Sequence, residues 1–320
     1  MRVLVTGANG FVGARVVQVL RDRPDVNVVS GVRRLGVHCD AIIGEQRELG
    51  DLAQASFDIS QFSDIDVVVH TAARVHVMQD READPLLAFR RTNVEALKSL
   101  AVVAALAGVK RFVLVSSIKV NGEETLPGRP FNAEDEAAPA DPYGISKYEA
   151  EQVLRQVCEG SSMEWVVVRP PLVYGPGVKA NFMRLMQSLG RGMPLPVGSL
   201  HNRRSLVALD NLVDLLVTCL SHPQAANQTF LVSDGDDLSV AALTEHLSQL
   251  LASRSWLLPI PPSCLRAALR MAGRSAVAQR LCGELRVDIG KTHSLLGWQP
   301  PMAVKEALAL TAAHYLEHHR

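Results

Sequence analysis

The sequence has few cysteines, no excess charge of either sign and no long apolar run, and each absence excludes a class of protein. The 33 basic residues balance the 33 acidic ones, so no nucleic-acid-binding surface is expected. No apolar run reaches the roughly 18 residues that a membrane-spanning helix needs, so no membrane insertion is expected. The cysteines form no C-x-x-C pair, which predicts reduced thiols rather than disulfides or a zinc site. They are Cys39, Cys158, Cys219, Cys264 and Cys282.

The composition is typical of a folded globular protein, with 48% apolar and 21% charged residues in a chain of 320. This length exceeds the usual size of one hydrophobic core, so one large domain or two unequal lobes are expected. An expected strand begins at residue 2, which leaves no room for a signal peptide. We therefore expect a cytoplasmic protein.

Short apolar runs alternate with longer amphipathic segments in the first half of the chain. This alternation predicts an α/β fold, a parallel, doubly wound sheet of the Rossmann type. The expected strands are 2–7, 26–32, 41–43, 66–70, 111–117 and 164–170. The expected helices between them are 10–22, 85–107 and 143–159.

Prolines and glycines cluster after Arg169, which marks a change of organisation. We expect residues 1–169 to form the dinucleotide-binding domain and residues 170–320 to form a smaller lobe over the carboxyl ends of the strands. The segments "SLVAL" and "TFLVS", between about 205 and 233, are expected to return to the sheet.

A glycine-rich turn follows the first expected strand, in the pattern G-x-x-G-x-x-G. Gly7 permits a tight turn, Gly10 lets the backbone approach a pyrophosphate, and Gly13 lets the helix pack closely on the sheet. The amino end of the next helix offers free N–H groups to the anion. The residues expected to contact a dinucleotide here are Gly7, Asn9, Gly10, Phe11, Val12 and Gly13.

The end of the second expected strand bears on the choice between NAD(H) and NADP(H). An acidic residue there would bind the adenosine ribose of NAD, but the position holds Val32. Arg33 and Arg34 follow, and guanidinium groups suit a 2′-phosphate. We therefore favour NADP(H) and keep NAD(H) as the alternative. Asp58 and Ile59 are expected to hold and cover the adenine.

Tyr143 and Lys147 stand four residues apart in an expected helix, so both face the same way. An ammonium group beside a phenol favours the phenolate, which can move a proton to or from a substrate oxygen. Ser116 and Ser117, at the end of the fifth expected strand, offer a hydroxyl to hold that oxygen.

Five short motifs occur in a fixed order: G-x-x-G-x-x-G, "HTAA", "TNV", "VSSIKVNG" and "YGISK". In this order they resemble the extended short-chain dehydrogenase/reductases over nearly the whole chain, and most of all the nucleotide-sugar 4-epimerase and 4-reductase group. The resemblance makes Tyr143 the acid/base and Lys147 its partner. In S-x-x-V-Y-G the catalytic hydroxyl stands five residues before the glycine, here Gly122, so it implies Ser117 rather than Ser116.

The same resemblance implies further contacts around the cofactor. It assigns them to Ala72, Ala73, Asn93 and Pro170, with Asn93 supporting the active site from its helix. The tyrosine of the family's "VYG" is replaced by Asn121, which removes one expected sugar contact.

Two positions after Ser117 argue against dehydration. Nucleotide-sugar 4,6-dehydratases carry Asp-Glu there, whereas this sequence has Ile118 and Lys119, which cannot act as a matched acid/base pair. Lys119 is instead expected to contact substrate.

The second half of the chain resembles the family's segments for a UDP-linked sugar. The resemblance points to Asn181 and Arg204 at the diphosphate, to the stretch from Leu195 to Val197 at the uracil, and to Arg280 as a second clamp. Arg204 could also pair with a carboxylate such as Asp210.

The resemblance leaves several functions open. We favour an NADPH-dependent reductase of a UDP-4-keto-6-deoxy-hexosamine in surface polysaccharide biosynthesis. The alternatives are a UDP-glucose or UDP-N-acetylglucosamine 4-epimerase with retained NAD, and a non-catalytic NAD(P)-sensing regulator. A homodimer is compatible with the family. We interpret the ten histidines as structural or surface residues without metal-ligand spacing, so no metal is expected.

Overall fold

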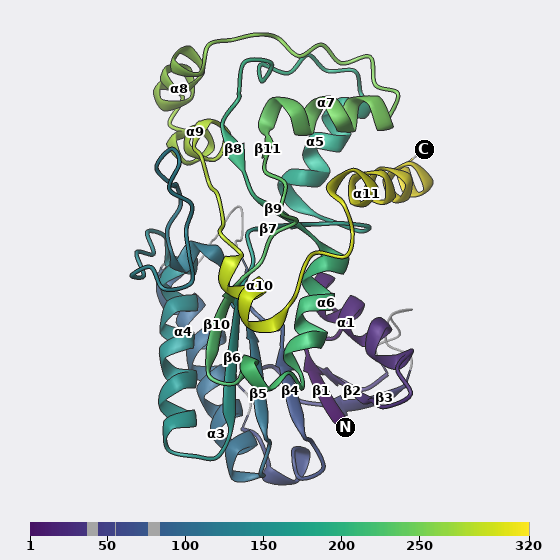
Figure 1. Ribbon diagram of the computed structural model, residues 1–320, viewed down its shortest axis with the longest axis vertical. Coiled ribbons are helices and arrows are strands. Elements are labelled where there is room, and N and C mark those ends of the chain that lie inside the picture. The colour runs from purple at the N-terminus through teal and green to yellow at the C-terminus, as the bar shows by residue number, and fades with distance from the viewer. Residues whose placement is uncertain (37–43, 55, 76–83, 320) are drawn as a thin grey trace.

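The computed structural model describes residues 1–36, 44–54, 56–75 and 84–319. Figure 1 shows a sheet flanked by helices in the lower part and a smaller group of helices and short strands above it. Among the described residues, no helix is both long and apolar enough to cross a lipid bilayer.

Seven parallel strands form the sheet, in the order β10-β6-β5-β4-β1-β2-β3. The strands are β1 (Arg2–Thr6), β2 (Asn27–Val32), β3 (Glu45–Glu48), β4 (Val67–His70), β5 (Arg111–Val115), β6 (Glu164–Arg169) and β10 (Gln228–Leu231). Five of the expected strands are confirmed. The segment 41–43 lies outside the described residues. The edge strand β3 was not predicted, because "EQRE" is polar and has no buried residue.

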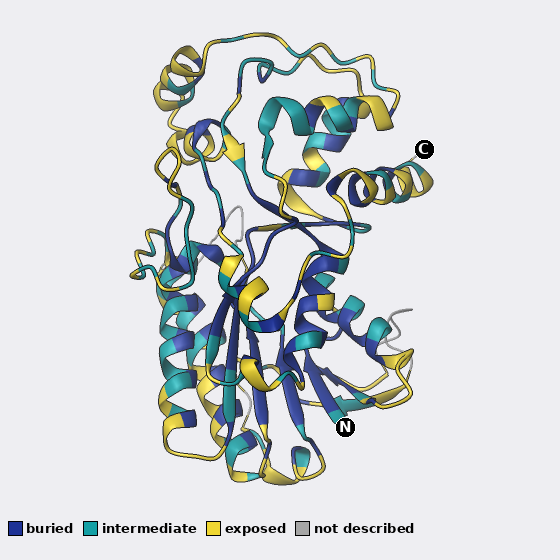
Figure 2. Cartoon of the chain, viewed as in Figure 1, coloured by how far each residue is buried: buried dark blue, intermediate teal, exposed yellow. Residues whose placement is uncertain are grey.

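Helices cover both faces of the sheet, as the doubly wound fold predicts. α1 (Phe11–Arg21) and α6 (Leu209–Cys219) pack on one face, and α3 (Ala96–Leu106) and α4 (Pro142–Glu159) pack on the other. The strands between them are buried, as the dark core in Figure 2 shows. Both apolar faces of the sheet are thereby removed from water, which is the main source of stability.

The expected helix at 85–107 consists of three pieces. α2 (Pro85–Arg90) is followed by a π-helical turn at Arg91–Glu95, and α3 continues the chain. π turns are rare in proteins, and those that occur are frequently found at functional sites. This one places Asn93 in the interior, where only 2% of it is exposed.

Two small sheets lie between the large sheet and the outer helices. β7 (Leu172–Tyr174) pairs with β9 (Leu206–Ala208), and β8 (Arg203–Arg204) pairs with β11 (Leu238–Ser239). The prediction that "SLVAL" joins the large sheet is therefore wrong, since β9 pairs with β7. "TFLVS" does join it, as β10.

The remaining helices form the smaller part and its return to the sheet. They are α5 (Ala180–Gly190), α7 (Val240–Leu250), α8 (Pro262–Met271), α9 (Ser275–Cys282), α10 (Gly290–Leu296) and α11 (Val304–His319). A separate apolar cluster, including Tyr174, Phe182 and Leu308, joins α5, α7 and α11. The carboxyl ends of the large sheet's strands face this part (Figure 1), which is where open α/β sheets bind ligands.

Candidate functional site

The glycine-rich turn leaves no room for side chains. Gly7 has φ +70°, and a Cβ on it would lie 2.7 Å from the Ala72 backbone nitrogen. A Cβ on Gly13 would lie 2.2 Å from the Gly7 carbonyl oxygen. Helix α1 begins after Gly10, which gives it no side-chain cap. The turn thus combines close packing with an uncapped helix end, and this arrangement fits the phosphates of a dinucleotide.

The other predicted contacts of this turn are more open. Asn9 and Gly10 are exposed, and Phe11 and Val12 are half-buried. Across the turn, Ala72 and Ala73 follow β4 and are half-buried. Ala72 lies against the turn, because its backbone nitrogen is the atom that a Cβ on Gly7 would meet.

The residues after β2 present two cations to solvent. Arg33 and Arg34 are exposed and form no hydrogen bond or ion pair with any residue that the structure describes. Asp58 caps the short helix η1 (Ile59–Gln61) by accepting from the Ser60 backbone N–H at 2.8 Å. Ile59 is 50% exposed. Because they have no partner among the described residues, the exposed guanidinium groups of Arg33 and Arg34 can bind an anion.

Ser117 and Tyr143 are brought together as predicted. Ser117 follows β5 and caps the short helix η3 (Ile118–Val120). Tyr143 lies in the first turn of α4, which Asp141 caps by accepting from the Gly144 N–H at 2.6 Å. Burial and the charge of Asp141 raise the pKa of Tyr143 to about 12, and a side-chain hydrogen bond with Ser117 opposes this rise.

Lys147 is buried, and its Nζ donates to the Val115 carbonyl oxygen at 2.6 Å. Burial lowers the pKa of Lys147 to about 8, and the charge of Glu151 opposes this effect. The expectation that this ammonium group favours the phenolate of Tyr143 stays a prediction.

A buried polar network lies behind these residues, and the sequence reasoning missed most of it. Arg169, at the end of β6, donates to both carboxylate oxygens of Glu151, at 2.9 and 2.6 Å. Arg169 also donates to Asn121 Oδ1 at 2.9 Å, and Ser116 Oγ donates to Glu151 Oε1 at 2.5 Å. Ser116 is thus committed to Glu151, which leaves Ser117 for the reacting site.

Asn93 acts as a clamp between two segments of the site. Its Oδ1 accepts from the Arg74 N–H at 2.8 Å, and its Nδ2 donates to the Arg74 carbonyl at 3.1 Å and to Ser146 Oγ at 3.0 Å. It therefore ties the segment after β4 to helix α4. Pro170 is buried, and its carbonyl accepts from the Ile118 N–H at 2.9 Å, which fixes the segment that follows Ser117.

Lys119 is held by carboxylates beside the site. Its Nζ forms ion pairs with Asp141 and, at 3.2 Å, with Glu123. Lys119 thus offsets the charge of the carboxylate that raises the pKa of Tyr143.

In the smaller part, the structure brings Arg204 and Arg280 near each other. Arg204 Nη1 donates to the Gly283 carbonyl at 2.9 Å. Burial lowers the pKa of Arg204, the charge of Glu124 opposes this, and the charge of Arg280 lowers it further. Two neighbouring guanidinium groups favour the binding of a diphosphate, because its negative charge would offset their mutual repulsion. Asp210 bonds Arg15 at 2.6 Å and is not the partner of Arg204.

The other predicted substrate residues differ in exposure. Asn181 is exposed in the first turn of α5, directly after Ala180, whose φ is +56°. Leu195 is half-buried and forms a bridge to Leu257. Val197 is only 6% exposed and belongs to the apolar cluster beneath α8 and α9. Val197 therefore contributes its side chain to packing.

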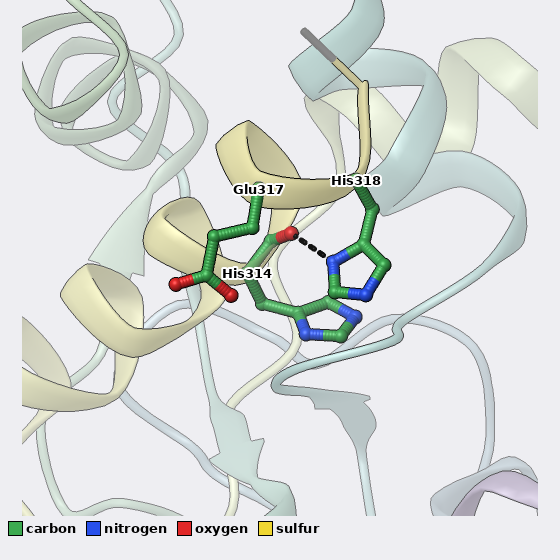
Figure 3. A group of neighbouring side chains, drawn as sticks. All are labelled: His314, Glu317 and His318. Carbon is green, nitrogen blue, oxygen red and sulfur yellow. Dashed lines mark hydrogen bonds between the residues drawn. The ribbon is translucent and has the colours of Figure 1, made fainter.

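One cluster contradicts the interpretation of the histidines. His314 and His318 stand four residues apart in α11, with Glu317 between them, and their ligand atoms and that of Glu317 lie within 4.8 Å of one another. Figure 3 shows the three side chains gathered at the end of the helix. The statement that the histidines lack metal-ligand spacing is wrong for this pair.

Comparison with known proteins gives two kinds of match. Residues 3–233 match the sequence model of the "NAD dependent epimerase/dehydratase family". The UDP-glucose 4-epimerase of Vibrio cholerae is 47% identical over 317 residues, which cover 98% of this chain and 95% of that protein.

Solved structures resemble this one in fold. The UDP-glucuronic acid 4-epimerase of Bacillus cereus, in complex with NAD, matches with a TM-score of 0.79 at 18% identity, over 100% of both chains. The UDP-glucose 4-epimerase of Thermotoga maritima, with UDP-glucose, matches with a TM-score of 0.78 at 21% identity, over 99% of both chains. At these identities the likeness concerns the fold alone.

Proposed function

The chain belongs to the NAD dependent epimerase/dehydratase family, and we propose that it is a 4-epimerase of a UDP-linked hexose or N-acetylhexosamine. The observation that carries the proposal is the 47% identity to the Vibrio cholerae UDP-glucose 4-epimerase along almost the full length of both chains. The reductase that the sequence favoured takes second place.

The residues of the glycine-rich turn fit a nicotinamide dinucleotide. The uncapped amino end of α1 would hold its pyrophosphate, and Asp58 and Ile59 would lie at its adenine. When bound, the nicotinamide supplies hydride exchange at carbon 4 of the sugar.

Tyr143 moves the proton that accompanies this exchange. Its phenolate takes the proton of the 4-hydroxyl, and the phenol later returns it to the oxygen of the 4-keto sugar, so the proton balance closes within one turnover. Ser117 holds the same oxygen, and its nearness to the phenol of Tyr143 supports this role. Burial and the charge of Asp141 raise the pKa of Tyr143, and the positive charges of Lys147 and of an oxidised nicotinamide, when it is bound, would favour the phenolate.

We assign residues 170–320 to the nucleotide-sugar lobe and residues 1–169 to the dinucleotide domain. The nearness of Arg204 to Arg280 supports a diphosphate clamp. Asn181, exposed at the start of α5, is placed at the same diphosphate, and Leu195 at the uracil. Ile118 and Lys119 stand where a dehydratase needs an acid/base pair, so the chemistry ends at carbon 4.

A second candidate is the NADPH-dependent reductase of a UDP-4-keto-6-deoxy-hexosamine for surface polysaccharide. One observation favours it: Arg33 and Arg34 are exposed after β2, at the position suited to a 2′-phosphate. A reductase consumes its cofactor, whereas an epimerase retains it.

Absorbance at the nicotinamide band separates the two functions. Purified protein is incubated with UDP-galactose or UDP-N-acetylgalactosamine, and the sugar is followed by proton NMR. We expect the carbon-4 epimer to accumulate to equilibrium without net loss of NAD(P)H. Stoichiometric loss of NADPH with a UDP-4-keto sugar, and no epimer from either UDP-sugar, would replace the proposal by the reductase.

A further inference from the structure

We propose that His314, Glu317 and His318 bind a divalent transition ion of the zinc class at the carboxyl end of α11. The three residues occupy positions i, i+3 and i+4, which lie on one face of a helix. Their ligand atoms lie within 4.8 Å of one another, and Figure 3 shows the two rings and the carboxylate on the same side of the helix end. None of the three belongs to the residues assigned to the cofactor or the UDP-sugar.

A hydrogen bond prepares one of the two imidazoles as a ligand. His318 Nδ1 lies 2.9 Å from the His314 carbonyl oxygen. Because a carbonyl oxygen can only accept, Nδ1 carries the proton in this bond and Nε2 keeps its lone pair. A backbone carbonyl that fixes the tautomer of a histidine is a usual partner of metal-binding imidazoles.

The distances allow closure around an ion. Zinc binds imidazole nitrogen and carboxylate oxygen at about 2.0–2.2 Å, so two ligand atoms of a tetrahedral site are roughly 3.3 Å apart. No gap here exceeds 4.8 Å, so none has to shorten by more than about 1.5 Å. Glu317 and His318 are exposed, and their side chains can rotate by this amount without displacing packed neighbours.

The chemistry of the ligands selects the class of ion. Two imidazoles and one carboxylate suit zinc, cobalt, nickel or copper, whereas magnesium and calcium prefer oxygen ligands alone. Three protein ligands leave at least one coordination position to water. His314 lies beside Gly177, in the loop before α5, because a Cβ added to that glycine would lie 3.9 Å from His314 Nε2.

Cobalt serves as the probe because its visible absorption reports the ligand geometry that spectroscopically silent zinc adopts. The full chain is freed of metal with a chelator and titrated with Co²⁺, and Zn²⁺ is then added in competition. We expect one Co²⁺ per chain with visible d–d bands that Zn²⁺ abolishes. His314→Ala, His318→Ala and Glu317→Gln should each weaken binding by about tenfold or more, by analogy with the loss on removing a supporting partner.

His319→Ala is the matched control. His319 is the next residue of the same helix, but its ring stacks on Tyr315 and its Nδ1 lies against the Tyr315 carbonyl. This variant should keep the affinity of the natural chain. Circular dichroism without metal checks that all four variants are folded. Absence of a cobalt band in the natural chain, unchanged affinity in any of the three ligand variants, or an equal loss in His319→Ala would overturn the assignment.

Discussion

Tyr143 lies on the same helix face as the buried Lys147, and burial, Asp141 and Ser117 all act on the pKa of its phenol. Asp141 caps the helix that carries Tyr143 and also raises the pKa of the phenol. The ion pair of Asp141 with Lys119 limits this effect. The i, i+4 spacing correctly indicated which side chains share a face, but the hydrogen bond of Lys147 to Val115 depends on the neighbouring strand.

Removal of the phenolic hydroxyl tests the proton transfer. Tyr143→Phe should lower turnover by about 10²–10⁴-fold, the usual contribution of a positioned acid/base. Bound nicotinamide, measured by absorbance, should remain. Tyr148→Phe is the control, because Tyr148 lies on the same helix and has no assigned role in the site. Near-natural turnover in Tyr143→Phe would remove this residue from the mechanism.

The pH profile should report Lys147. Its pKa is lowered to about 8 by burial, so the ammonium is present below that pH and is lost as the pH rises through it. If the ammonium supports the reaction, kcat/KM should fall above about pH 8. In Lys147→Arg the guanidinium stays protonated, so this alkaline fall should move to higher pH, whatever the remaining rate. If the natural chain and Lys147→Arg lose activity at the same alkaline pH, the group that titrates there is not Lys147.

The cations after β2 can be tested by their preference between cofactors. Replacing Arg33 and Arg34 by alanine should weaken NADPH binding by roughly 1.5–3 kcal/mol, the worth of hydrogen bonds to a charged group. NADH binding should barely change. Arg23→Ala, an exposed arginine before the same strand, is the control. Fluorescence titration with both cofactors is the measurement, and equal effects on both would make these arginines ordinary surface residues.

At the scale of elements, α4 depends on its buried contacts to β6 and to the π turn. Glu151 is fully buried, and Arg169 is 3% exposed, so their ion pair resists solvent screening. Asn93 joins the same helix to the segment after β4. These contacts fix helix α4, which carries Tyr143 and Lys147, relative to the sheet and to the segment after β5 that carries Ser117.

Breaking the buried pair should cost stability. Glu151→Gln leaves the Arg169 charge uncompensated, and the loss of one partner of a buried pair costs about 3–5 kcal/mol. Glu149→Gln is a matched control two residues away, since Glu149 pairs with Arg90 near the surface, where the side chains are 29% and 44% exposed. That change should cost roughly 1 kcal/mol or less. Urea denaturation measures both, and equal losses would contradict the structural role of Glu151.

Strongly patterned elements could be predicted from the sequence, and weakly patterned ones could not. The short, nearly continuous apolar runs at β1, β4, β5 and β6 are typical of parallel strands that are buried on both faces. The edge strand β3 is polar, and its place is set by pairing with β2. The π turn has no sequence signal, and the buried network depends on the pairing of Arg169 with Glu151, which joins β6 to α4.

At the scale of the whole molecule, the site is composed from distant segments. β8 and α9 bring Arg204 to Arg280, although 75 residues of other structure separate these positions in the chain. Motif order allowed the family and the doubly wound fold to be predicted, and the roles of the reacting residues stay predictions. The pairing of β9 with β7 and the packing of Val197 follow from tertiary contacts that no local pattern encodes. The cluster at His314 is different, because its three residues lie within one helical turn and their spacing can be read from the sequence.

The diphosphate clamp makes a prediction about UDP without any sugar. Arg204→Leu should weaken UDP binding by about 2–5 kcal/mol, in part because phosphate charge is left unpaired. Arg203→Leu is the control, because Arg203 is the exposed neighbour on the same strand. Calorimetric titration of UDP measures both affinities, and a thermal melt reports stability. Unchanged UDP affinity with a lower melting temperature would give Arg204 a structural role only.

The fate of the hydrogen at carbon 4 tests the central claim most directly. A 4-epimerase takes this hydrogen as hydride and returns it to the same carbon, so the label stays in the sugar. We predict that UDP-glucose or UDP-N-acetylglucosamine deuterated at carbon 4 becomes its epimer with deuterium retained there, as NMR and mass spectrometry would show. We also expect no net change in nicotinamide absorbance. Loss of the deuterium to free nicotinamide, or no epimer from either sugar, would contradict it.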